Sequence, residues 1–228
     1  MRQPVLWMGL GIFAACAAAQ AARTAPNYQL KIKWSKGASL QLKITTTVSG
    51  FSDAAKVPGL NGGKLTFIGA FRATVSSVDE SGATVQSEMG PFLLPSGDAV
   101  LPKSTSIQHI DSLGFARENG DYFGPQFPKE SIKVGAIWKG NDPLSGGNAL
   151  GMKGLSKYRL ISVRTIAGRR VADLGYETIS GNGLAGKGKL SVDVATGRLI
   201  NGVGSYQVHD AQAGAGRTLQ IDITVAKT

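Results

Sequence analysis

His109 and Asp111 are the pair of residues in this sequence whose types could support acid–base chemistry. They stand two positions apart in a segment with strand-like alternation, so both side chains would project from one face. A histidine beside a carboxylate can act as general base for a serine nucleophile. The sequence has no G-x-S-x-G turn to supply that serine. Among the possible functions of this chain, the sequence therefore favours a hydrolase that uses His109 and Asp111 the least.

The second histidine, His209, precedes Asp210, and adjacent residues of a strand point to opposite faces. Metal sites built on imidazole need further ligands at suitable spacing, and the sequence contains neither H-E-x-x-H nor a calcium-binding loop. We therefore expect structural or solvent-facing histidines and no metal site.

Residues 181–188, G-N-G-L-A-G-K-G, match the glycine spacing of dinucleotide- and phosphate-binding loops. Those loops bind phosphate because they open a helix whose first amides face the anion. Residues 189–194 instead alternate in polarity as a strand does, and Gly188 stands where a magnesium-binding Ser or Thr is needed. We interpret residues 181–188 as a flexible inter-strand loop and expect no cofactor.

Residues 1–21 are typical of a secretory signal peptide. Arg2 is followed by 15 uncharged residues from Val5 to Ala19, and Ala19-Gln20-Ala21 has the small-x-small cleavage pattern. This predicts an exported protein, secreted, periplasmic or in the outer envelope, with no transmembrane span in the mature chain. Cleavage removes the sole cysteine, Cys16, and with it any disulfide or thiolate chemistry. A lipid anchor at Cys16 is the minor alternative, because the residues before it faintly resemble a lipobox.

The chain is strongly basic, with 25 Lys and Arg against 15 Asp and Glu. For an exported protein the anionic partners at hand are envelope lipids, polysaccharides and wall polymers, and we expect no nucleic acid. Aromatic residues make up only 7% of the chain, too few for a stacking platform. The simpler interpretation is a charged surface that keeps the protein soluble.

Wherever residues 22–228 are periodic, the period is two, and no segment has a helical period. This predicts one all-β domain of antiparallel strands with one polar face. Such a sheet must bury its other face, so we expect a curved sheet closing as a barrel or half-barrel, with a β-sandwich as the alternative.

The clearest predicted element is a hairpin over residues 28–49 that turns at Lys36-Gly37. Its polar face would carry Lys31, Lys33 and Lys43. A lysine stripe of this kind most often prevents edge pairing between sheets. The alternative is a face for an anionic partner.

Residues 91–143 contain six of the nine prolines and are expected to be mostly loop, with short strands near 107–110 and 134–138. Tyr122, Phe123 and Phe127 lie in this region. They could form a mobile lid over an apolar ligand. They could equally plug an open end of the fold, which is the favoured interpretation.

The layout resembles a group of uncharacterised exported bacterial β-proteins, a domain of unknown function. The similarity rests on four segments: Leu30 to Leu42 with Lys36-Gly37, Pro128 with residues 133–138, Tyr158 to Val171, and Asp193 with Thr196-Gly197-Arg198-Leu199. It implies export and β-structure, and no catalytic residues.

The sequence therefore favours a non-enzymatic exported β-domain that binds a partner or has a structural role in the envelope. Its partner would be an anionic envelope component or an apolar ligand. The alternative is a lipid or lipoprotein carrier, which would need an open apolar concavity.

Overall fold

The computed structural model describes residues 25–51, 59–117, 124–144, 154–179, 184–210 and 217–228. The predicted signal peptide with Cys16, and Tyr122 and Phe123 of the Pro-rich region, lie outside the described residues.

Strands are the only regular elements in the described part of the chain, which confirms the all-β prediction. They are β1 Ser39–Ser49, β2 Lys64–Asp79, β3 Gly82–Met89, β4 Phe92–Leu93, β5 Ala99–Leu101, β6 Ser104–Ile110, β7 Ile137–Asn141, β8 Leu155–Ile166, β9 Arg169–Ile179, β10 Leu184–Asp193, β11 Leu199–Asp210 and β12 Arg217–Lys227. No helix in these residues is long and apolar enough to cross a membrane.

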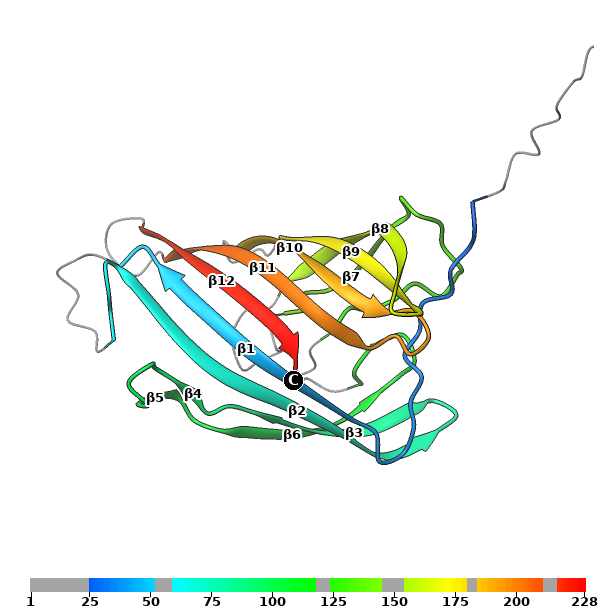
Figure 1. Cartoon of the computed structure of the whole chain (residues 1–228), viewed down its shortest axis with the longest axis horizontal. Helices are drawn as coiled ribbons and strands as arrows, with labels where there is room; N and C mark the ends of the chain where they lie inside the picture. Colours follow the sequence, from blue (N-terminus) through cyan, green and yellow to red (C-terminus); the bar gives the residue numbers. More distant parts are fainter. Residues whose placement is uncertain (1–24, 52–58, 118–123, 145–153, 180–183, 211–216) are drawn as a thin grey trace, which may run out of the picture.

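All strand pairs are antiparallel and belong to one sheet. The main path runs β5-β4-β2-β1-β12-β11-β10-β9-β8-β7, and β3 joins β2 to β6. Strand β7 does not pair back onto β6, so the sheet is curved but not closed, and a barrel is not formed. In Figure 1 the strands β12 to β8 lie across from β2, β3 and β6, as in a sheet folded over a shared interior.

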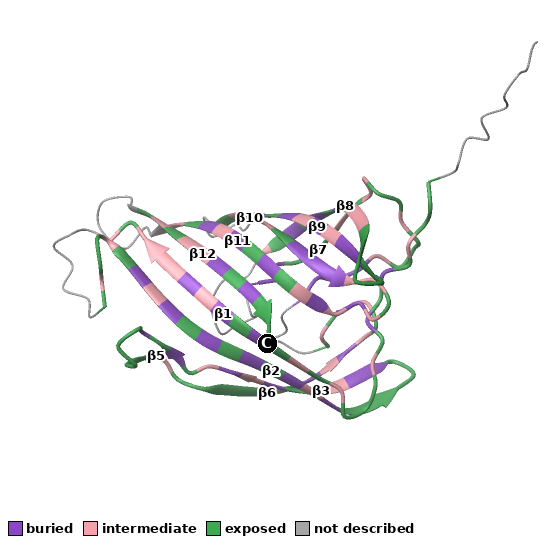
Figure 2. Ribbon diagram, viewed as in Figure 1, coloured by how far each residue is buried: buried purple, intermediate pink, exposed green. Residues whose placement is uncertain are grey.

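Burial alternates along most strands, as the period of two predicts. Figure 2 shows buried residues spaced between exposed ones along β1 and β2. The buried side chains form one core cluster on the inner face of the sheet, and the segments outside the strands add Leu30, Ile32, Phe127 and Leu144 to it. The inner face is thus covered partly by sheet and partly by these connecting segments.

The predicted hairpin over residues 28–49 is wrong. Strand β1 pairs with β2 and β12, and the residues before it form no strand with it. Instead the backbone N–H of Ile32 donates to the carbonyl of Ser112 at 2.6 Å, and that of Lys33 donates to Thr196 at 2.9 Å. The alternation correctly indicated that Ile32 is buried and Lys33 exposed, because it reports the direction of side chains and not the pairing partner.

Two tight turns join strands that are consecutive in the chain. The turn at residues 79–82 joins β2 to β3, and the turn at residues 195–197 joins β10 to β11. The Pro-rich region contains four short strands, of which β6 and β7 lie close to the two positions expected and β4 and β5 were not expected.

The glycine-rich motif is not an inter-strand loop over residues 184–188, because these residues begin β10. The inner face explains their composition. A Cβ on Gly186 would lie 2.2 Å from Cδ1 of Tyr206, and one on Gly188 would lie 2.2 Å from the carbonyl oxygen of Val203 and 2.5 Å from Oη of Tyr176. Glycine is needed there because the tyrosine rings occupy the space of a side chain.

We predict that Gly188→Ala lowers the free energy of unfolding by about 2–3 kcal/mol, the usual cost of overpacking a close-packed core. Urea denaturation followed by tryptophan fluorescence measures the change. The matched control is Ala185→Val on the exposed side of β10, which should shift stability by less than about 0.5 kcal/mol. Equal stability of Gly188→Ala and the wild type would contradict this account of the glycines.

Candidate functional site

The imidazole of His109, in β6, lies against the turn between β2 and β3 and not against the side chain of Asp111. Its Nε2 is 3.0 Å from Oγ of Ser81, which donates to Oδ1 of Asp79 at 2.6 Å. Oδ1 of Asp111 instead accepts the backbone N–H groups of Leu113 and Phe115. The predicted histidine–aspartate pair is therefore not joined by a hydrogen bond.

Asp79, Ser81 and His109 have the residue types of a hydrolase triad, but their hydrogen bonds are arranged differently. In a triad the carboxylate orients the imidazole, whereas here it accepts the hydroxyl of the serine. The serine hydroxyl and backbone N–H of Ser81 hold the pKa of Asp79 below its ordinary value. The carboxylate thus stabilises the exposed turn that ends β2.

A row of neighbouring aromatic rings lies on the inner face of β7 to β11. The centroids of Trp138 and Tyr158 are 5.5 Å apart with nearly parallel planes, those of Tyr158 and Tyr176 are 6.3 Å apart, and those of Tyr176 and Tyr206 are 6.5 Å apart. Strand β10 lies between β9 and β11, and the two tyrosines meet across its glycines.

The row ends at Asp142, which is buried just after β7. Its Oδ1 accepts the Tyr206 hydroxyl at 2.8 Å and the Leu144 N–H at 2.9 Å, and its Oδ2 accepts the hydroxyl of Thr178. Because Tyr206 donates to Asp142, the Tyr176 hydroxyl must donate to Tyr206, at 2.8 Å. The network ties the segment after β7 to strands β9 and β11.

Burial raises the pKa of both Tyr176 and Tyr206 above the ordinary value of a phenol, and the charge of Asp142 acts in the same direction. Both hydroxyls therefore stay protonated and serve as donors at physiological pH. This network could not be predicted from the sequence, because Asp142 is an isolated acid in the Pro-rich region and only the fold brings it to the tyrosines.

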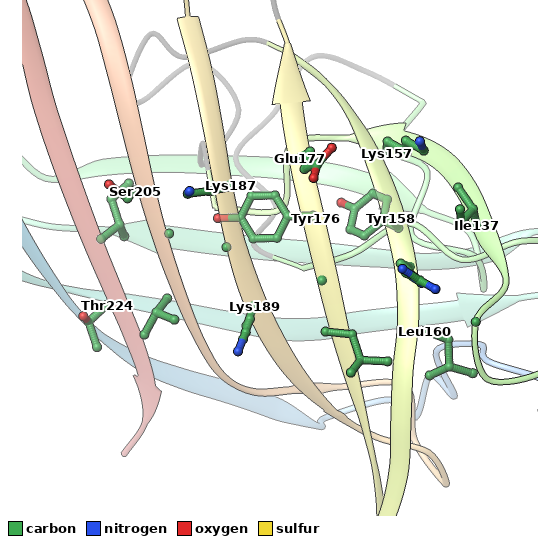
Figure 3. A pocket seen from close by; sticks show the side chains of 18 of the residues that line it. Ile137, Lys157, Tyr158, Leu160, Tyr176, Glu177, Lys187, Lys189, Ser205 and Thr224 are labelled. Carbon is green, nitrogen blue, oxygen red and sulfur yellow. The ribbon is translucent and has the colours of Figure 1, made fainter.

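The opposite face of the same strands contains a shallow depression of about 1020 Å³, which we call the outer groove. Its lining side chains on the exposed face come from β7 to β12 and from residues just before β7 (Figure 3). They are Val134, Ile137, Lys157, Arg159, Ile161, Glu177, Lys187, Lys189, Val203, Ser205, Asp222 and Thr224, with Gly175 among them.

Strand register places Arg159, Gly175 and Lys189 side by side on β8, β9 and β10. Gly175 contributes no side chain between the two cations, and the side chain of Ile161 leans over part of this position. A Cβ on Gly175 would lie 3.1 Å from Cδ1 of Ile161, which borders the gap. The neighbouring register row carries Lys157, Glu177 and Lys187.

The cations of the outer groove are exposed, and Glu177 lies between Lys157 and Lys187 in the strand register without forming an ion pair with either. Within the described ranges, no carboxylate lies in ion-pair distance of Lys157, Arg159, Lys187 or Lys189. Glu177 and Asp222 are the acids of the groove, so four positive charges face two negative ones.

Arg164 differs from these cations, because it is paired. Its Nε and Nη2 donate to the two oxygens of Asp173 at 2.6 and 3.1 Å. Ser162 and Ser191 also donate to that carboxylate. The Arg164 guanidinium, together with these hydroxyls, holds the pKa of Asp173 below its ordinary value against the opposing effect of partial burial.

The lysines predicted from sequence do not form one stripe. Lys43 is exposed on the outer face of β1, whereas Lys31 and Lys33 are exposed on the connecting segment that contacts Ser112 and Thr196. Phe127 is buried in the core, and its N–H donates to the carbonyl of Leu113 at 2.8 Å. The groove cations are a larger cluster, which sequence alone could not assemble because it depends on strand register.

No protein-family model matches this chain, and no curated protein matches it. The resemblance to uncharacterised exported β-proteins stays a prediction. The candidate site therefore depends on the geometry and charge of the described residues.

We predict that Tyr206→Phe lowers the free energy of unfolding by about 1–3 kcal/mol, because it removes a hydroxyl that satisfies both Asp142 and Tyr176. Thermal and urea unfolding measure the loss. Tyr28→Phe, at a half-buried tyrosine that lies outside this network, is the control and should change stability by less than about 0.5 kcal/mol. An unaltered unfolding midpoint for Tyr206→Phe would show that the network adds nothing.

We also predict a small acid-dependent contribution from Asp173. Because its pKa is lower in the folded than in the unfolded chain, its contribution is present above the unfolded pKa and is lost as pH falls through the folded pKa. Asp173→Asn should therefore lose up to about 1 kcal/mol at pH 7 and much less near pH 2. Urea midpoints across this range test it, and a difference that grows on acidification would contradict it.

Proposed function

We propose that this protein is an exported, non-enzymatic β-domain that binds an anionic component of the cell envelope through the outer groove. The observation that carries the proposal is the cluster of Lys157, Arg159, Lys187 and Lys189, exposed around one depression without ion-pair partners among the described residues. Clustered cations raise the local concentration of an anion and speed its association. The signal-peptide pattern of residues 1–21 supports export.

Binding fits the described side chains better than catalysis does. The imidazole of His109 contacts a serine whose hydroxyl is already bound by Asp79. The carboxylate of Asp142 is buried and accepts hydrogen bonds from the fold itself. A general base needs a substrate proton within reach, and neither group lines the outer groove.

The carrier alternative would need an open apolar concavity on the inner face. In the described residues that face is packed by side chains such as Leu30, Phe127 and Leu144, each almost fully buried. This observation favours a half-barrel-like sheet that serves as a scaffold, with the ligand on its outer side.

The proposal predicts that dextran sulfate, used as a soluble polyanion, binds the protein in a salt-dependent way. The double substitution Arg159→Glu/Lys189→Glu should weaken binding roughly tenfold or more, because it replaces two attractive charges with two repulsive ones. A tenfold loss corresponds to about 1.4 kcal/mol of binding free energy. Isothermal titration calorimetry at low and high salt measures the effect.

The matched control is Lys31→Glu/Lys33→Glu, which changes net charge by the same amount on the exposed connecting segment. It should reduce affinity only about twofold through the overall field. Equal losses in both double variants would show a diffuse charge effect and contradict a site in the outer groove.

A further inference from the structure

The geometry points to a specific class of ligand for the outer groove: a single-chain anionic amphiphile, bound one molecule at a time. Its acidic head would lie over Gly175 between Arg159 and Lys189, and its chain would run along Ile161, Ile137 and Val134. This inference rests on the proposed function and adds the chemistry of the ligand.

The head position follows from the register of β8, β9 and β10. Arg159 and Lys189 both pair with Gly175, so their strands are separated by twice the inter-strand spacing, about 10 Å. Gly175 contributes no side chain between them, and Ile161 leans over one edge of this position from β8. Two long cationic side chains on either side of such a gap can both reach one anion above it, and arginine can bind a carboxylate or phosphate with two parallel hydrogen bonds.

The chain position follows from exposed aliphatic side chains. Val134, Ile137 and Ile161 are 50, 54 and 44% exposed and all line the groove. Ile137 is paired with Arg159, and the N–H of Gly135 donates to the carbonyl of Leu160, so the three lie at the β7–β8 end beside the arginine. Single exposed aliphatic residues are ordinary, but a contiguous set beside cations marks a binding surface.

The shape of the groove favours one molecule over a membrane. A volume of about 1020 Å³ is at the upper end of the range for small-molecule sites, about 300–1,000 Å³. Proteins that bind a membrane surface insert protruding apolar side chains between lipids. Here the aliphatic groups line a depression, where a single chain can cover them and a planar bilayer cannot.

The test compares decyl phosphate with butyl phosphate, each below the concentration at which it forms micelles, by isothermal titration calorimetry on the full mature chain. We expect decyl phosphate to bind at least tenfold more tightly, because the longer chain buries additional methylenes. Decyltrimethylammonium, which has the same chain and the opposite charge, should not bind detectably.

Two variants test the binding of the acidic head and the binding of the aliphatic chain separately. Ile137→Ser/Ile161→Ser should reduce the preference for decyl over butyl phosphate to threefold or less. Gly175→Leu should weaken decyl phosphate at least tenfold by filling the gap. Ile107→Ser, on the distant strand β6 and 65% exposed, is the control and should leave the preference unchanged. Circular dichroism and urea midpoints establish that each variant is folded.

Each outcome supports or contradicts one hypothesis about the ligand of the outer groove. Equal affinity for the two phosphates, with dextran sulfate still dependent on Arg159 and Lys189, would overturn the amphiphile and leave the proposed function standing. Binding to phosphatidylglycerol vesicles without binding of monomeric decyl phosphate would overturn it in favour of a membrane surface. Failure of all anions to bind would remove the proposed function itself.

Discussion

The close packing of Tyr176 and Tyr206 across the glycines of β10 is the constraint on which this part of the fold depends. Strand β10 separates the strands that carry the two rings, so their hydroxyls can meet only where β10 presents hydrogen atoms in place of side chains. That meeting places the Tyr206 hydroxyl on Asp142 and so anchors the segment after β7. A buried polar chain of this kind is stabilising only while every member has its partner.

The same constraint shapes the outer face. Along Gly186-Lys187-Gly188-Lys189 the glycines point inward and the lysines outward, because successive residues of a strand alternate between faces. Strand β9 has the reverse arrangement, with Tyr176 inward and Gly175 outward. The same alternation along the strands therefore places the aromatic row on the inner face and the cations of the outer groove on the opposite face. A shift of the strand register by one residue would disrupt both.

Alternating polarity was sufficient to predict that the described residues form strands and no helix, and that residues such as Ile32 are buried. It was not sufficient to predict that β1 pairs with β12, nearly the whole chain away, because polarity does not encode the partner. The glycine motif was correctly separated from phosphate-binding loops by the strand that follows it. The prediction of a loop at residues 184–188 is nonetheless wrong, because the sequence does not distinguish a glycine that makes room for a neighbouring ring from a glycine in a turn. The Arg159–Gly175–Lys189 row became visible only with the register of three strands.

Charge pairing distinguishes the two arginines of β8, of which only Arg159 lines the outer groove. Arg164 is held by both oxygens of Asp173, whose remaining hydrogen bonds come from two serines, so its charge is already satisfied by the protein. Arg159 is opposite Gly175, and it forms no ion pair with a carboxylate of the described residues. An unpaired exposed cation costs the fold little, since exposed ion pairs contribute only about 0–1 kcal/mol. Leaving Arg159 and Lys189 unpaired therefore sacrifices almost no stability and keeps both charges available to an anion from outside.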